Sequence, residues 1–115
     1  MKLTNKRAYD LLQYMGGLHE TGKLGFYIAK NMRLLKTELT EYIDIRNRTI
    51  DKYGEPENGV YRIPSKNVSL FLDSMKPYDD IECSFTPVQV DRELFISGTL
   101  ESNDMFNLDW MVKDD

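Results

Sequence analysis

The stretch LGFYIAKNMRLLKTELTEYIDIRNRTIDKY, residues 24–53, decides how this chain folds. Apolar residues recur in it at intervals of three and four, the period of an amphipathic helix. The positions of this stripe are Ile28, Met32, Leu35, Leu39, Tyr42 or Ile43, Arg46, Ile50 and Tyr53. A single helix over residues 24–53 would be about 45 Å long at about 1.5 Å per residue. Because a compact domain of this size needs a shorter helix, we expect part of it to project or to pair with another surface.

Two further apolar residues, Leu34 and Ile45, lie beside the main stripe of this helix. The apolar face is therefore wider than a coiled-coil seam. It either packs wholly on the preceding helix or also contacts a partner, and periodicity alone does not separate these alternatives. Tyrosine is a residue type that suits interfaces. We predict that Tyr27, Leu34 and Ile45 bind a partner protein, and a homodimer through the long helix is compatible with this prediction.

Clear start and stop signals lie on both sides of the long helix. Thr4 is placed to cap a first helix over residues 5–15, which the pair Gly16-Gly17 ends. After residue 53, an acidic glycine turn contains Asn58-Gly59, residues that tolerate positive φ. A short strand is predicted directly after it, over residues 60–63.

The C-terminal half is predicted to hold short elements. Pro64-Ser65 opens a helix that Pro77 closes, with Val68, Phe71, Leu72 and Met75 on one face. Alternation over residues 81–85 predicts a strand that buries Ile81, Cys83 and Phe85. Short strands are expected at residues 88–90 and 94–96, and Ser102 is expected to cap a helix over residues 103–112.

These elements predict an α+β fold in one domain, residues 1–115. Residues 1–53 form a helical hairpin with one long amphipathic helix. Residues 54–115 form a small antiparallel sheet with two short helices.

Composition narrows the class of protein. The chain has 115 residues, 41% of them hydrophobic, with one cysteine and one histidine. A single cysteine forms no internal disulfide, and one cysteine with one histidine does not make a structural zinc site. The N-terminus lacks a secretory pattern, and no apolar run is long enough to span a membrane. We therefore expect a cytoplasmic protein with no cofactor, no metal and no membrane partner.

Charge is distributed unevenly. Residues 1–36 carry seven basic and two acidic residues, whereas the remainder carries eight basic and seventeen acidic residues. The net charge of −4 argues against a dedicated nucleic-acid binder, because affinity for phosphate backbones comes mostly from clustered Lys and Arg.

The segment from Gly17 to Lys23 has the glycine and lysine spacing of a phosphate loop, but Leu24 stands where that loop needs a Ser or Thr hydroxyl. His19 lies in the same segment and has no partner fixed by spacing. An enzyme built around His19 and Lys23 should bind nucleotide and lose that binding with Lys23→Ala. We interpret the segment instead as a connection between helices, and the chain as non-enzymatic.

Carboxylates gather in the C-terminal half, most densely at Asp79, Asp80 and Glu82, without the spacing or glycine of a calcium loop. Their default interpretation is a solvated acidic face. The alternative is an acidic partner-binding surface that imitates a phosphate backbone and occupies the nucleic-acid site of a host nuclease, as an anti-CRISPR-like inhibitor would.

The order of features resembles that of a family of small uncharacterised proteins encoded by tailed phages and prophages of Gram-positive bacteria. The shared features are an amphipathic, charged N-terminal helical segment, an acidic glycine turn and a hydrophobic closing segment, here residues 106–112. The resemblance implies a viral origin and a role in particle assembly or in blocking a host system. We therefore expect a protein that acts in the host cytoplasm by binding a host or phage protein.

Overall fold

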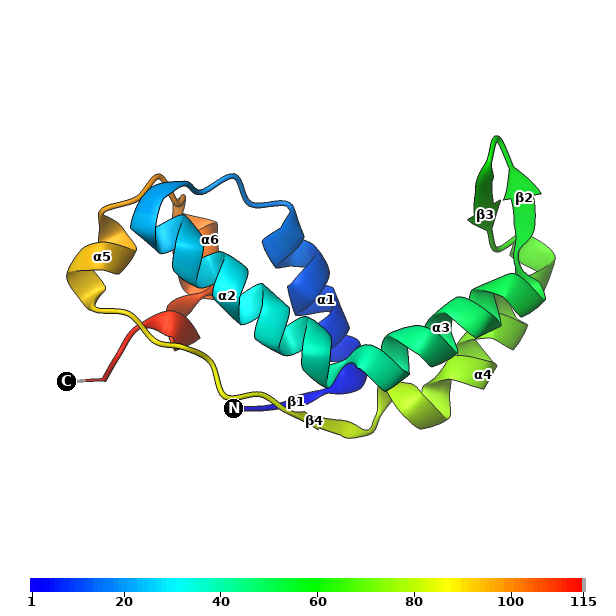
Figure 1. Ribbon diagram of the computed structural model, residues 1–115. Helices are drawn as coiled ribbons and strands as arrows, with labels where there is room; N and C mark the ends of the chain where they lie inside the picture. Colours follow the sequence, from blue (N-terminus) through cyan, green and yellow to red (C-terminus); the bar gives the residue numbers. More distant parts are fainter. Residues whose placement is uncertain (115) are drawn as a thin grey trace.

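The structure, a computed structural model, describes residues 1–114 and has the α+β class that the sequence predicts. It divides the expected helix over residues 24–53 into α2 (Gly22–Glu38) and α3 (Thr40–Tyr53). The two helices meet at Leu39, which is fully buried and has φ −92° and ψ 9°. The chain changes direction between α2 and α3 (Figure 1).

Threonine hydroxyls account for the change of direction at Leu39. Thr37 Oγ1 donates to the carbonyl oxygen of Arg33 at 2.9 Å, and Thr40 Oγ1 donates to that of Thr37 at 2.8 Å. Side chains that bond back to the preceding turn in this way bend helices. The hydrogen bonds from Leu39 N to Leu35 O and from Ile43 N to Leu39 O are kept across the bend.

The N-terminus is tied to a strand far away in the sequence. Thr4 caps α1 (Asn5–Gly16), as predicted, by accepting a hydrogen bond from the backbone N–H of Arg7. The preceding β1 (Lys2–Thr4) was not expected, and it pairs antiparallel with β4 (Glu82–Ser84). The helical and sheet-containing halves of the chain are therefore interleaved.

Residues 40–80 form an arm that projects from the rest of the molecule, which we call the body (Figure 1). After α3 the arm holds the hairpin of β2 (Glu55–Glu57) and β3 (Val60–Arg62), then η1 (Ser65–Asn67) and α4 (Val68–Asp79). The radius of gyration is 16.5 Å, whereas a compact chain of this length has about 13 Å. The expectation that part of the long helical segment projects is thus met by α3.

The predicted turn at Asn58-Gly59 is confirmed at the tip of the arm. Asn58 has φ 52° and Gly59 has φ 81°, the left-handed pair that a tight hairpin requires. The predicted end of the following helix is wrong, because Pro77 lies inside α4. Proline has no backbone N–H, so the last turn of α4 lacks the hydrogen bond that residue 77 would otherwise donate.

The C-terminal segment is more helical than expected. Residues 94–96 belong to α5 (Arg92–Ile96) and not to a strand, and Val90 makes one parallel bridge to Val112. The expected helix over residues 103–112 is divided into α6 (Ser102–Asn107) and η2 (Asp109–Met111).

The cap of α6 also differs from the prediction. Glu101, and not Ser102, is its N-cap residue, in a capping box with Asp104. The side chains of both residues therefore accept hydrogen bonds from the backbone at the start of this helix.

Two core clusters hold these elements together. The first lies where the arm meets the body and contains Ala8, Leu12, Leu35, Leu39, Tyr42, Met75, Cys83 and Phe85. The second lies within the body and contains Met15, Leu24, Ile28, Val90, Phe95, Leu100, Leu108 and Met111. Leu11, Met32 and Trp110 pack against both clusters. The interpretation of Cys83 and Phe85 as core residues is confirmed, whereas Ile81 is 52% exposed.

Candidate functional site

Within residues 1–114, the segment from Gly17 to Lys23, which ends in the first turn of α2, does not bring together a group of catalytic or ligand-binding side chains. His19 and Lys23 are both exposed, and neither has a hydrogen-bond or ion-pair partner for its side chain within residues 1–114. In that same part of the chain, no three His, Cys, Asp or Glu side chains are grouped so as to hold a metal ion. The distinctive surface features lie on the arm and at its base.

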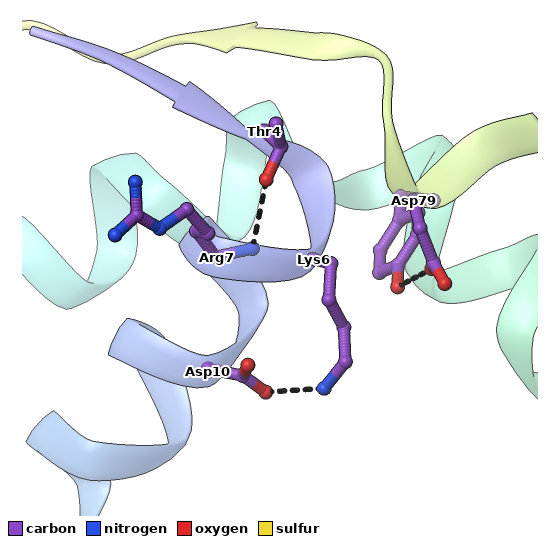
Figure 2. A network of polar contacts seen from close by, with 6 residues as sticks. Thr4, Lys6, Arg7, Asp10 and Asp79 are labelled. Atoms are coloured by element: carbon purple, nitrogen blue, oxygen red, sulfur yellow. Dashed lines mark hydrogen bonds and ion pairs between the residues drawn. The ribbon is translucent and has the colours of Figure 1, made fainter. Parts of the chain in front are cut away.

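The base of the arm holds a buried tyrosine with a charged partner. The phenol of Tyr42, in α3, donates a 2.5 Å hydrogen bond to the carboxylate of Asp79, at the end of α4 (Figure 2). Burial, and then the hydrogen bond to this carboxylate, raise the pKa of Tyr42 well above its ordinary value. Tyr9 packs edge-on against the Tyr42 ring, and the Arg46 guanidinium lies 4.6 Å from the centre of the Tyr9 ring.

The hydrogen bond between Tyr42 and Asp79 makes the acidic surface smaller than the sequence predicts. Asp79 is partly buried, and its carboxylate joins the two helices of the arm. Asp80 and Glu82 are exposed, and neither forms an ion pair with any residue that the structure describes. The acidic surface at the base of the arm therefore presents two of the three predicted carboxylates.

The predicted residues Tyr27, Leu34 and Ile45 are divided between α2, which holds Tyr27 and Leu34, and α3, which holds Ile45. Tyr27 is partly buried against the second core cluster and packs edge-on against Phe26. Leu34 is 39% exposed on α2. Ile45 is partly buried against the first core cluster. Because the bend at Leu39 separates α2 from α3, the expected continuous binding face is divided.

Ile45 instead lines a groove of about 290 Å³ between α3 and α4. The remaining lining residues are Arg48, Thr49, Lys52, Tyr53, Ser74 and Tyr78. Across the groove, Ser74 Oγ donates to the phenol oxygen of Tyr53 at 3.3 Å, and Lys52 Nζ lies 5.2 Å from the centre of the Tyr53 ring. The groove thus combines aromatic rings with two cationic side chains.

The clearest feature of the arm is its exposed apolar surface. Between residues 60 and 72, five large apolar side chains are exposed: Val60 (57%), Tyr61 (53%), Val68 (40%), Leu70 (51%) and Leu72 (55%). Val68, Leu72 and Met75 were predicted to share one face of α4. Of these three, Met75 is buried, whereas Val68 and Leu72 are exposed. The rest of the arm therefore covers only part of this apolar face.

Comparison with known proteins yields no match: no family model, no curated protein and no solved structure is similar to this chain. Among the described residues, no helix has the length and apolar character needed to cross a bilayer.

Proposed function

We propose that this is a non-enzymatic protein of phage type that acts by binding another protein, and that the arm is its binding element. The observation that carries the proposal is the group of five exposed apolar side chains between residues 60 and 72. They belong to a segment that projects from the body, where a partner can reach them (Figure 1).

Exposure of these apolar side chains to water is energetically unfavourable. Burying a Val or Leu side chain that is otherwise exposed contributes about 1.5–3 kcal/mol. Val68 and Leu72 are four residues apart and so lie on one face of α4. With the hairpin residues Val60 and Tyr61 they give the arm exposed apolar area that a partner can bury.

The groove between α3 and α4 adds residue types that anchor interfaces. Tyrosine and arginine are enriched among the residues that contribute most to binding energy. Tyr53, Tyr78 and Arg48 supply both types within one groove. In keeping with the resemblance to phage proteins, the proposed partner is a protein of the phage or of its bacterial host.

The test is capture of the partner from a lysate of phage-producing Gram-positive bacteria, with the retained proteins identified by mass spectrometry. Val68→Asp and Leu72→Asp are each expected to reduce retention of the partner at least tenfold, equivalent to about 1.4 kcal/mol. The matched control is Ile81→Asp, because Ile81 is 52% exposed but lies beyond α4. Undiminished capture by both arm variants, or no capture by the unmodified protein, would contradict the proposal.

A second candidate function follows from the exposed carboxylates of Asp80 and Glu82 at the base of the arm. In this candidate the protein inhibits a host nuclease by occupying its basic nucleic-acid site. Binding would then be lost at high salt and weakened by the pair Asp80→Asn and Glu82→Gln, while Leu72→Asp would leave it unchanged. The two candidates therefore predict opposite results for the same variants.

A further inference from the structure

Helix α2 has an excess of positive charge, and its one acidic residue, Glu38, stands at its C-terminal end. Residues 22–37 contain four basic residues and no acidic residue: Lys23, Lys30, Arg33 and Lys36. All four are exposed, and none forms an ion pair within residues 1–114. At about 1.5 Å per residue these cations extend along about 20 Å of the helix.

The C-terminal part of the body has the opposite character. Residues 93–112 contain four acidic residues and no basic residue: Glu93, Glu101, Asp104 and Asp109. Glu101 and Asp104 serve the capping box of α6, and Asp104 also accepts a hydrogen bond from Tyr14. Glu93 and Asp109 are exposed, and neither has an ion-pair partner in the described part of the chain.

Both charged segments also expose large apolar side chains. On α2 these are Phe26, which is 62% exposed, and Leu34, which is 39% exposed. In the acidic segment they are Ile96, which is 57% exposed, and Phe106, which is 78% exposed. Each segment therefore has what a protein interface needs, apolar area together with charges of one sign.

We propose that the occupant of the α2 surface is a second copy of this chain, which places its acidic segment, residues 93–112, against the basic residues of α2. The charge complementarity is between two surfaces of the same body that do not pair with each other within one chain. In a two-fold arrangement each copy contributes both surfaces, so every contact occurs twice.

The net charge of −4 does not prevent this association. At physiological ionic strength, charges separated by more than about 8 Å are largely screened, whereas pairs in contact across an interface are screened much less. Local complementarity therefore outweighs the overall repulsion. Because the pairs are formed at a protein surface, association is expected to weaken as salt is raised.

This inference is independent of the proposed function. The self-association surface belongs to α2 and the C-terminal part of the body, whereas partner binding is assigned to the arm, residues 40–80. Two copies joined through their bodies would each keep an arm for a partner.

The test is a charge exchange followed by light scattering and sedimentation. The first variant carries Lys30→Glu and Arg33→Glu, and the second carries Glu93→Lys and Asp109→Lys; all four residues are exposed. In each variant alone, one of the two surfaces carries two basic and two acidic residues, so the charge complementarity is lost. Each variant is therefore expected to associate at least tenfold more weakly than the unmodified protein. An equimolar mixture restores two complementary pairs of surfaces, so it is expected to recover association.

A control variant, Lys66→Glu with Lys76→Glu, changes the net charge as the first variant does but lies on the arm, and it is expected to associate normally. Circular dichroism establishes that each variant is folded. The inference is overturned if the unmodified protein has the 13.5 kDa mass of a monomer up to its solubility limit. It is also overturned if the mixture associates no better than either variant alone.

Discussion

The phenol of Tyr42 and the carboxylate of Asp79 are 2.5 Å apart, and this hydrogen bond joins α3 to the end of α4 at the base of the arm. We expect Tyr42→Phe to lower the free energy of unfolding by about 1–2 kcal/mol, because a hydrogen bond to a charged group is lost while the ring is kept. Urea denaturation followed by circular dichroism measures this change. Tyr78→Phe, on an exposed ring, is the control and should change stability by less than about 0.5 kcal/mol.

The same tyrosine predicts how stability depends on alkaline pH. Burial and the bond to Asp79 raise the pKa of Tyr42, so the folded chain holds this proton more tightly than the unfolded chain does. Its contribution is fully present below about pH 10 and is lost as the pH rises further. The free energy of unfolding should therefore fall more steeply above pH 10 in the unmodified protein than in Tyr42→Phe. Parallel curves for the two proteins would show that this proton does not contribute.

Asn31 links α2 to the segment that follows β4. Its side chain is fully buried, donates to the carbonyl oxygen of Val88 at 2.9 Å and accepts from the N–H of Val88 at 2.7 Å. Asn31→Ala should cost about 2–3 kcal/mol, because it leaves both backbone groups without their partner. Gln13→Ala, on the exposed side of α1, is the control for chemical denaturation. Equal midpoints for the two variants would contradict this role.

At Gly25, helix propensity and packing predict opposite effects of substitution by alanine on the stability of the protein. Replacing glycine by alanine in a helix usually stabilises it by about 1 kcal/mol. A Cβ atom at Gly25, however, would lie 2.5 Å from the backbone carbonyl oxygen of Glu20. We expect Gly25→Ala to destabilise the protein by about 1–3 kcal/mol in thermal and urea denaturation. At Gly16 the nearest atom, Met32 Cε, would be 3.7 Å away, so Gly16→Ala should not destabilise.

Cys83 reports on opening of the first core cluster. It is 5% exposed, and burial raises the pKa of its thiol. Because the thiolate is the reactive form, labelling by a thiol reagent near neutral pH should be slow in the folded protein. The labelling rate should rise steeply through the urea transition. In Tyr42→Phe this rise should begin at a lower urea concentration, because the variant is less stable. Fast labelling without urea would contradict the buried position of this residue.

Local signals in the sequence predicted several elements correctly. Thr4 caps the first helix, Asn58-Gly59 forms the hairpin turn and Cys83 lies inward on its strand. Each of these features depends on a few neighbouring residues, whose conformational preferences can be read from the sequence.

The features that the sequence did not predict depend on distant contacts. The strand β1 exists because it pairs with β4, some eighty positions later in the chain. Leu39 has the periodicity of a continuous helix, and the bend there depends on threonine hydroxyls together with the core that surrounds it.

The candidate site was predicted in part. The long helical segment was expected to project, and α3 does, but Ile45 faces the groove and core of the arm. The exposure of Val68 and Leu72 was not predicted, because an apolar face in the sequence does not say how much of it a neighbouring helix covers.

The most direct test of the central claim, partner binding through the arm, is the amount of captured partner retained by Leu72→Asp relative to Ile81→Asp. These side chains are exposed to a similar extent, 55% and 52%, and differ in whether they belong to the apolar surface of the arm. We predict that Leu72→Asp loses at least nine tenths of the partner, whereas Ile81→Asp retains it. Equal retention by the two variants would contradict the assignment of binding to the arm.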